Sequence, residues 1–258
     1  MAGLMEGKTG LIMGVANSRS IAYKIAERLH KEGAELAFSY QDERIAEKAV
    51  PLFKELDSIY HDKLNVLDDD NFAEFFNKLS DKLDGKLDFL VHSIAGGPGK
   101  EDLKGMFIDT SREGFLRSME ISVYSFIKAL HLAYPMMEGR NAAALTLSYY
   151  GAEKVIPNYN VMGVAKSALE SSVRYMADDL GQEGIRVNAL SPGPVLTRAA
   201  SAVSGFRKLL QGFEDRAPMK RLIEREEIAS SALYLLSNLS SGVTGEVVHV
   251  DAGYNIKG

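Results

Sequence analysis

Segments with strand-like and helix-like apolar patterns alternate along almost the whole chain, and this alternation is the feature that most restricts its fold. The strand-like segments are short and apolar, as in "TGLIMGV" at 9–15, whereas segments such as 20–33 carry apolar residues at helical spacing. Strands alternating with helices build βαβ units, and such units form a parallel sheet covered on both faces. We therefore predict an α/β fold.

The pattern predicts one doubly wound, Rossmann-like domain over residues 1–258, with a central parallel sheet of about seven strands and helices on both faces. We expect the helix at 42–56 to be broken or kinked near Pro51. The predicted strands cover 9–15, 34–40, 61–67, 86–95, 142–149, 185–193 and 245–254, and the predicted helices cover 20–33, 42–56, 69–83, 112–137, 159–180 and 225–238.

Composition narrows the class of function. The chain has 258 residues and a net charge of −5, which gives no electrostatic case for a nucleic-acid partner or an anionic membrane. It has no cysteine, so disulfides and cysteine-ligated metals are excluded, no metal is expected, and a reducing cytoplasm is the expected location. No signal peptide and no membrane span are predicted.

Ligands of doubly wound sheets bind beyond the carboxyl ends of the strands, so the strand-end loops are the places to look for a site. The first loop, "GVANSRSIA" at 14–22, lacks the G-x-G-x-x-G spacing. Its small residues and the helix start at Ser20 and Ile21 still suit a pyrophosphate, and Ser20 can also cap the helix. An ordinary strand–helix turn is the alternative interpretation.

Two further loops fit a dinucleotide. Gln41 follows the second strand, where an adenosine ribose is recognised, and Asp42 and Glu43 would repel a 2′-phosphate that Arg44 would attract. The balance favours NAD(H) over NADP(H). After the fourth strand, "HSIAGGPG" at 92–99 offers bare backbone to a ring or a ribose, with a merely flexible glycine loop as the alternative.

Tyr159 and Lys166 are seven residues apart, which places them on one face if both lie on one helix. We expect the Lys166 ammonium to lean back toward the phenol, favour its ionised form and make it a better proton donor near neutral pH. Tyr149 ends the preceding strand and should face the same edge, whereas Tyr150 should point away and serve packing. Chance spacing of packed tyrosines is the alternative.

These residues carry a resemblance. The chain resembles the short-chain dehydrogenases/reductases, and within them the bacterial NADH-dependent enoyl-[acyl-carrier-protein] reductases, through "GVANSRSIA", "HSIA", "SREGF", "LSYYGAEKVIPNYNVMGVAKSALE", "VRYMADDLGQEGIRVNALSPGP" and "SGVTGEVVHVDAGY". Ordinary members use Y-x3-K with an upstream serine. The enoyl reductases use Y-x6-K with a second tyrosine ten residues before the first, as here.

The resemblance implies reduction of the double bond of trans-2-enoyl thioesters by hydride transfer from NADH, the final reductive step of fatty acid elongation. It implies that Tyr159 hydrogen-bonds the thioester oxygen, that Lys166 holds the nicotinamide ribose, and that Tyr149 shapes the pocket. The implied cofactor contacts are Gly14, Ser20, Ile21, Gln41, Asn65, Val66, Ser93, Ile94, Lys166, Val195 and Thr197. The implied substrate contacts are Gly97, Tyr149, Tyr159, Met162 and Phe206, with 194–222 as the substrate-binding loop and helix region.

The chain departs from the family at two places. Asn65 precedes Val66 where the family usually has aspartate–valine against adenine, and its side-chain carbonyl can still accept from an amino group. Gly96 stands where the family often has a bulky residue, which should enlarge or loosen this wall of the pocket.

The resemblance also implies partners: an acyl carrier protein that carries the substrate, and a homotetramer built on the C-terminal strand and the helices at 112–137 and 159–180. Acyl carrier proteins are acidic, so a basic docking surface is expected at Arg207, Lys208, Arg216, Lys220 and Arg221, although ordinary solvated side chains are the alternative. Two other functions stay open: a carbonyl reductase acting on 3-ketoacyl thioesters, which would want its lysine at Gly163, and a non-enzymatic NAD(H)-binding sensor.

Overall fold

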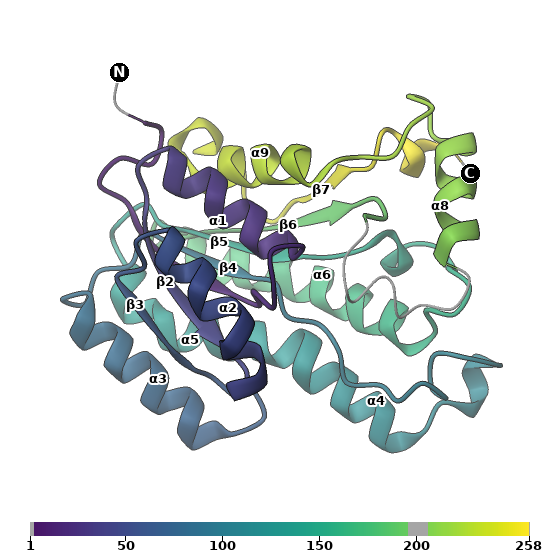
Figure 1. Cartoon of the computed structure of the whole chain (residues 1–258), viewed down its shortest axis with the longest axis horizontal. Coiled ribbons are helices and arrows are strands. Elements are labelled where there is room, and N and C mark those ends of the chain that lie inside the picture. Colours follow the sequence, from purple (N-terminus) through teal and green to yellow (C-terminus); the bar gives the residue numbers. More distant parts are fainter. Residues whose placement is uncertain (1–2, 196–205, 258) are drawn as a thin grey trace.

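A parallel seven-stranded sheet forms the centre of the computed structural model, which describes residues 3–195 and 206–257. The strand order is β3-β2-β1-β4-β5-β6-β7, and every neighbouring pair is parallel (Figure 1). The strands are β1 (Thr9–Met13), β2 (Glu35–Tyr40), β3 (Tyr60–Lys63), β4 (Phe89–His92), β5 (Ala143–Leu147), β6 (Arg186–Pro192) and β7 (Val247–Val250). The order reverses between β1 and β4, which is where doubly wound sheets open a crevice for a ligand.

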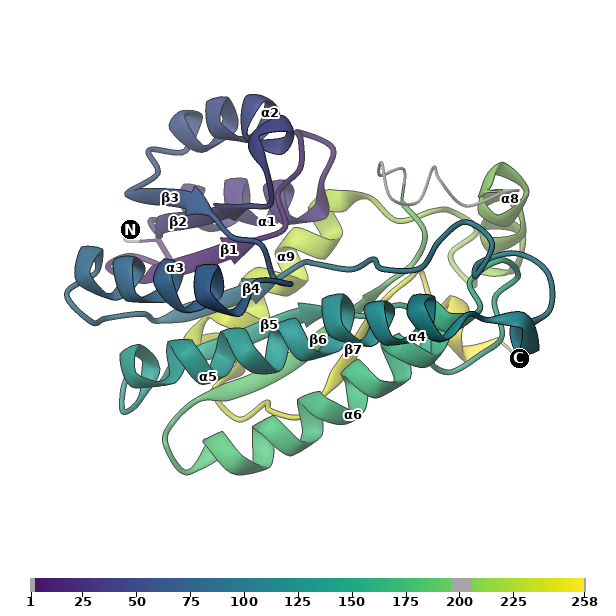
Figure 2. The same cartoon turned by 90° about the horizontal axis from the view of Figure 1, so that it is seen from below.

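Helices cover both faces of this sheet, and Figure 2 shows the two layers from below. One face packs against α1 (Ile21–Lys31), α2 (Glu43–Glu55) and α9 (Arg225–Leu236). The other face packs against α3 (Asp69–Lys82), α5 (Ser125–Met137) and α6 (Val161–Gly181). Within the described residues the remaining helices are α4 (Arg112–Met119) and α8 (Phe206–Arg216), and short 3₁₀ turns lie at Phe107–Asp109, Tyr150–Ala152, Asn238–Ser240 and Tyr254–Ile256. The predicted fold class is confirmed.

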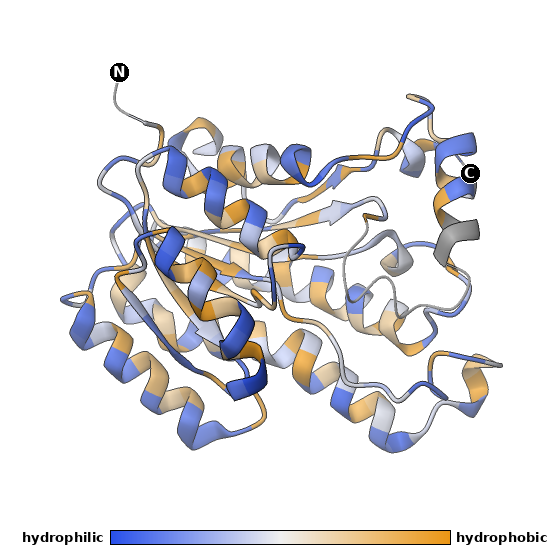
Figure 3. Ribbon diagram, in the orientation of Figure 1, coloured by the Kyte–Doolittle hydropathy of each residue, from blue (hydrophilic) through white to orange (hydrophobic). Residues whose placement is uncertain are grey.

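The central strands are buried along their whole length and mostly apolar, because both faces of the sheet are covered. All residues of β4 and β5 are buried. Along the helices hydrophobic and hydrophilic residues alternate, as the colours of Figure 3 show, and the hydrophobic ones include those buried against the sheet. Burial of these stripes on two sides of one sheet makes two core clusters with the sheet between them.

Several predicted boundaries differ from the structure. The helix around Pro51 is not broken, since α2 runs from Glu43 to Glu55 with Pro51 inside it. Pro51 is exposed, so the carbonyl that loses its helical N–H partner can bind water. The third strand ends at Lys63 rather than at 67, because Asn65 turns the chain by accepting a hydrogen bond from Leu67 N at 3.2 Å.

The predicted long helix at 112–137 is continuous but not uniform. Between α4 and α5 the residues Glu120–Tyr124 form a π-helical segment. Such segments are frequent at functional sites because the wider turn redirects side chains. Here the segment lies beside the loop that follows β4, to which it is hydrogen-bonded.

Candidate active site

The expected site residues follow the carboxyl ends of six neighbouring strands, so the fold brings them to one edge of the sheet. In Figure 1 this is the edge toward which β6 and β7 point, on the side of α8. Gly14, Ser20 and Ile21 follow β1, Gln41 follows β2, and Asn65 and Val66 follow β3. Ser93, Ile94 and Gly97 follow β4, Tyr149, Tyr159, Met162 and Lys166 follow β5, and Val195 follows β6. Thr197 lies outside the described residues, and Phe206 begins α8 without a described side chain.

The β1 and β4 loops touch where a phosphate cradle is expected. Gly14 has a φ of +97°, and a Cβ built on it would lie 2.1 Å from the carbonyl oxygen of Ser93. Only glycine satisfies both the backbone conformation and this close approach. Ser20 precedes α1, but its side chain does not cap the helix: Oγ accepts hydrogen bonds from the backbone N–H groups of Ala16 and Asn17, at 3.1 and 3.2 Å. Ser20 thus shapes the loop and leaves the helix N–H groups available.

Hydrogen bonds to backbone N–H groups hold one polar side chain in each of the next two loops: Asp42 after β2 and Asn65 after β3. The Asp42 carboxylate accepts from Ile45 N at 2.9 Å and caps α2, while Gln41 beside it is exposed. Asn65 Oδ1 is engaged by Leu67 N, and Asn65 N donates to Asn71 Oδ1 at 2.7 Å. The Asn65 oxygen retains a second lone pair for a ligand.

The π-helical segment holds the β4 loop. Ser122 Oγ accepts from Gly96 N at 3.1 Å and donates to Gly96 O at 3.0 Å. Gly97, with a φ of +114°, packs so closely that a Cβ on it would lie 2.5 Å from the carbonyl oxygen of Arg117. A Cβ on Gly96 would meet only Ile121 Cγ2, at 4.0 Å, which agrees with the wider wall expected there.

His92, at the end of β4, is a buried bridge rather than a site group. Its Nδ1 lies 3.1 Å from Thr146 Oγ1 on β5, and its Nε2 lies 2.8 Å from Ser125 Oγ at the start of α5. Burial, and to a smaller extent the positive charge of Lys166, lowers the pKa of His92 to about 3. The imidazole is therefore neutral at physiological pH and joins two strands to the helix.

Tyr149 and Tyr159 form the centre of the site. Their rings meet edge to face, with centroids 5.0 Å apart and planes inclined by 71°. Tyr159 is held between Asn158 and Asn160, whose φ values of 61° and 36° are unusual for residues with a side chain. Such strain persists only where surrounding contacts hold it and is concentrated at functional sites.

The predicted helical relation of Tyr159 to Lys166 is wrong. Helix α6 begins at Val161 with Asn160 as its N-cap, so Tyr159 lies in the preceding turn. The buried Lys166 Nζ donates to the carbonyl oxygen of Leu147 at 2.6 Å, at the end of β5. Lys166 is thus tied to the strand that carries Tyr149 and does not lean onto Tyr159.

The predicted effect on the phenol is wrong as well. Burial raises the pKa of Tyr159, and the neighbouring Tyr149 raises it further. Burial likewise raises the pKa of Tyr149. Both phenols therefore remain protonated hydrogen-bond donors, while burial lowers the pKa of Lys166 to about 8 and Glu170 opposes that change.

Tyr150 serves packing, as predicted. It is 5% exposed, its ring meets Tyr254 edge to face at 5.6 Å, and its hydroxyl donates to Asn255 O at 3.4 Å. Sequence reasoning did not find Gly151, next to it. A Cβ on Gly151 would lie 2.5 Å from Cδ1 of Tyr159. The only signal for it was a glycine after two tyrosines.

Three of the basic residues expected to dock a partner have intramolecular contacts. Arg221 forms a two-pronged ion pair with Glu227, at 2.7 and 2.8 Å. Lys220 Nζ donates to Asp215 O at 2.5 Å, and the Arg216 guanidinium lies 5.6 Å from the centre of the Tyr254 ring. The side chains of Arg207 and Lys208 are not among those described.

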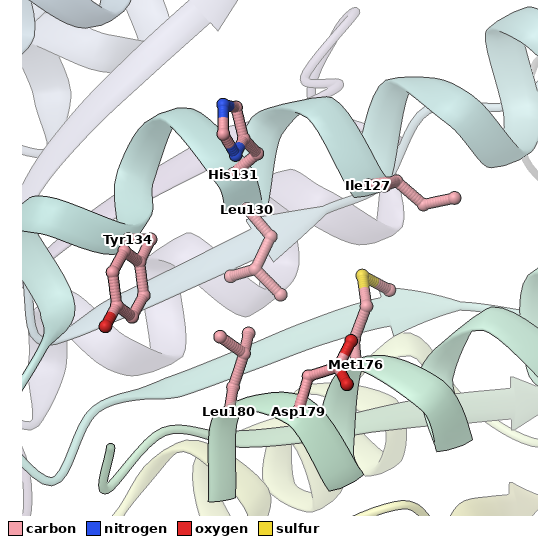
Figure 4. Close-up of a pocket in the computed structure, with 7 residues that line it drawn as sticks. All are labelled: Ile127, Leu130, His131, Tyr134, Met176, Asp179 and Leu180. Carbon is pink, nitrogen blue, oxygen red and sulfur yellow. The ribbon is translucent and has the colours of Figure 1, made fainter. Parts of the chain in front are cut away.

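A separate groove lies away from this edge, between the outer sides of α5 and α6 (Figure 4). Apolar side chains from both helices line it together with His131 and Asp179; the apolar members are Ile127, Leu130, Tyr134, Met176 and Leu180. In residues 3–195 and 206–257, no helix is both long and apolar enough to cross a membrane, and no cluster of His, Cys, Asp or Glu suits a metal ion.

Comparison with known proteins gives a consistent result. The model of the family described as enoyl-(acyl carrier protein) reductase matches residues 14–255. An enoyl-[acyl-carrier-protein] reductase [NADH] of Rhizobium meliloti is 52% identical over all of this chain and 93% of its own length. The crystal structure of the NADH enoyl reductase of Aquifex aeolicus is similar with a TM-score of 0.95 and 49% identity, covering 99% of each chain. The enzyme of Anaplasma phagocytophilum, solved in complex with NAD, gives a TM-score of 0.95 and 46% identity over 100% of this chain and 97% of its own.

Proposed function

Because the chain belongs to the enoyl-[acyl-carrier-protein] reductase family of the short-chain dehydrogenases/reductases, we propose that it reduces the double bond of trans-2-enoyl-acyl-carrier-protein with NADH. This reaction is the final reductive step of a cycle of fatty acid elongation. The observation that carries the proposal is the paired Tyr149 and Tyr159 beside Lys166 at the carboxyl end of β5, next to the loops that suit a dinucleotide.

The residues present fit NAD(H). The close approach at Gly14 leaves bare backbone beside the free N–H groups at the start of α1, an arrangement suited to a pyrophosphate. Lys166 has three donors, and the described residues account for one of them, so two remain for ribose hydroxyls. Asp42 places a negative charge in the loop after β2, where dinucleotide folds recognise the adenosine ribose, and this charge favours NADH over NADPH. When bound, NADH supplies the hydride that adds to the β-carbon of the substrate.

The chain's own residues then stabilise charge and position the substrate. Tyr159, protonated because burial raises its pKa, donates a hydrogen bond to the thioester oxygen as negative charge develops there. Tyr149 packs against it and fixes the ring. Gly97 and Met162 line the acyl pocket, the latter from the first turn of α6. Ser93, Ile94 and Val195 would contact the nicotinamide side of the cofactor. The resemblance assigns Thr197 to the cofactor and Phe206, with the 194–222 region, to the acyl chain; residues 196–205 lie outside the part of the chain that the structure describes.

Reduction of a carbonyl is disfavoured by the packing at Gly163. A carbonyl reductase of this superfamily would need its lysine at that position. A Cβ on Gly163 would lie 2.8 Å from the carbonyl oxygen of Gly151, so no larger side chain fits without displacing the turn that holds Tyr159. The geometry at Gly163 therefore does not support the alternative hypothesis of a 3-ketoacyl reductase.

One assay tests the proposal against both alternatives. NADH oxidation is followed at 340 nm with a crotonyl thioester and with an acetoacetyl thioester. Turnover of the crotonyl compound alone is expected. Turnover of the acetoacetyl compound alone would overturn the enoyl assignment in favour of a carbonyl reductase, and NADH binding without turnover of either would indicate a sensor.

The acyl carrier protein would present its substrate at the α8 side of the sheet edge, where the expected substrate contacts gather. We also propose that the enzyme is a homotetramer in which α5 and α6 pack against a second copy. The apolar groove of Figure 4 lies on this face, and Tyr175 nearby on α6 is 74% exposed. Light scattering during size-exclusion chromatography should give four times 28.3 kDa, and a monomer mass would contradict the proposal.

A further inference from the structure

Glu170 is a buried carboxyl group that the proposed chemistry leaves without a role. It lies four residues after Lys166 on α6, one helical turn further along the same face, and is 8% exposed. Its Oε1 accepts a hydrogen bond from the hydroxyl of Ser148, which is 4% exposed. Burial of a carboxylate costs free energy of folding unless it is hydrogen-bonded or paired with an opposite charge. Its position beside the candidate site therefore suggests a function.

Lys166 and Glu170 together hold consecutive residues of one strand end. The ammonium of Lys166 donates to the carbonyl oxygen of Leu147, and Glu170 accepts from the side chain of Ser148, the next residue. Tyr149 follows immediately. Two opposite charges on one helix face therefore fix the segment that positions the first of the two site tyrosines.

Other charged groups near Glu170 are few among the described residues. Glu153 follows the 3₁₀ turn after β5, His249 lies on β7, and Arg174 lies one turn along α6. Glu153 and His249 are hydrogen-bonded to each other, with Oε1 and Nε2 2.7 Å apart. The charge of Glu153 raises the pKa of Glu170, whereas His249 lowers it. Lys166 is buried and has one hydrogen bond from described residues. The neutral His92 on β4 is electrostatically coupled to it, and Glu170 is the charged group that favours its ammonium form.

We propose that Glu170 is a positioning residue, whose carboxylate, held by Ser148, keeps Lys166 in its charged form and through it fixes the end of β5 that carries Tyr149. The inference rests on the proposed function, since it assumes that charged Lys166 holds the cofactor ribose. Burial opposes the charge on Lys166 and Glu170 supports it. Loss of the carboxylate therefore moves the pH range in which Lys166 is charged downward.

The test compares Glu170→Gln with Ser148→Ala and Ser191→Ala. Glu170→Gln removes the charge but keeps an oxygen that can accept from Ser148. Ser148→Ala removes the hydrogen bond and keeps the charge. Ser191 is the matched control: it is 1% exposed on the neighbouring strand β6, and its Oγ has no hydrogen-bond partner among the described residues.

Two quantities are measured from pH 6.5 to 9.5: kcat/KM with a crotonyl thioester, and the dissociation constant of NADH by fluorescence titration without substrate. In Glu170→Gln the basic limb of both profiles should move to lower pH, so that its kcat/KM relative to wild type falls about tenfold between pH 7 and 9. Ser148→Ala should lower kcat severalfold with an unshifted limb, and Ser191→Ala should behave as wild type.

If Glu170→Gln folds and the basic limb of its pH profiles does not move, the inference is overturned. An equal shift in all three variants would also overturn it, because it would indicate a general loss of packing around the site. If Glu170→Gln does not fold, Glu170→Asp takes its place. Because this variant keeps the charge, the basic limb of its pH profiles must stay where it is in the wild type, and a displaced basic limb would overturn the inference. Wild type that binds NADH but does not turn over the thioester contradicts the proposed function instead, and the NADH titration still tests the role of Glu170.

Discussion

The ring of Tyr149 meets the ring of Tyr159 edge to face at 5.0 Å, although the two residues belong to different structural elements. Tyr149 extends β5 and Tyr159 lies in the turn before α6, so the contact joins the strand end to the helix start. It places two protonated phenols at the sheet edge. Only one of them needs to reach the substrate oxygen, and the other can support it.

Replacement of each phenol separates these roles. Tyr159→Phe should lower kcat about a hundredfold, the usual effect of losing one donor to a developing oxyanion, with little change in NADH affinity. Tyr149→Phe keeps the ring contact and should lower kcat less, by about tenfold or below. Steady-state kinetics with a crotonyl thioester measure both variants. Equal losses in the two would contradict the division of roles.

Gly151 should tolerate no side chain. In Gly151→Ala the new methyl group would lie 2.5 Å from Cδ1 of Tyr159, so the ring must move, and kcat should fall at least tenfold. Gly181→Ala at the end of α6 is the control, because a Cβ there meets nothing within 4 Å. That variant should be fully active. Normal activity in Gly151→Ala would show that the ring position is not needed.

Ser122 should matter through the loop that it holds. Ser122→Ala loses both hydrogen bonds to Gly96 and should raise KM severalfold while the free energy of unfolding falls by about 1–2 kcal/mol. The exposed Ser230, whose hydroxyl donates to Glu226 O of its own helix, provides the control variant Ser230→Ala. A KM as low as that of this control would mean that the loop keeps its shape without Ser122.

The charge of Asp42 should set cofactor choice. Asp42→Asn removes the charge, and asparagine caps helices as well as aspartate does, so α2 should remain intact. The ratio of kcat/KM with NADPH to that with NADH should rise about threefold to tenfold. Thermal unfolding checks that the cap survives. An unchanged ratio would assign the preference to another group.

His92 should make the protein less stable in mild acid. Its pKa is lowered to about 3 in the folded state, so below the unfolded pKa of about 6.5 only the unfolded chain takes up the proton. Stability is unaffected above that value and falls by about 1.4 kcal/mol per pH unit between about 6.5 and 3. The free energy of unfolding is measured in urea at pH 7.5 and 5.5. Between these two pH values it should fall by about 1.4 kcal/mol less in His92→Asn than in the wild type. The same loss in both would place the acid sensitivity elsewhere.

Much of the fold could be read from local patterns. The alternation of short apolar runs with amphipathic helices predicted all seven strands and the edge where the site residues gather. The errors lie where one local residue was taken to decide the geometry. Pro51 was expected to break or kink a helix that is not broken and that packs through Ala49 and Phe53. Ser20 was considered able to cap a helix, but its side chain folds back on its own loop.

The sequence by itself determined the sheet, the edge that binds ligands and the family, because apolar periodicity and the spacing of Tyr149, Tyr159 and Lys166 are properties of the chain alone. Only the tertiary structure decided what these groups do to each other. Lys166 bonds to Leu147, nineteen residues away, and Glu170 to Ser148, because β5 and α6 pack side by side. Burial in that packing, and not the seven-residue spacing, sets the pKa values of the phenols and the ammonium.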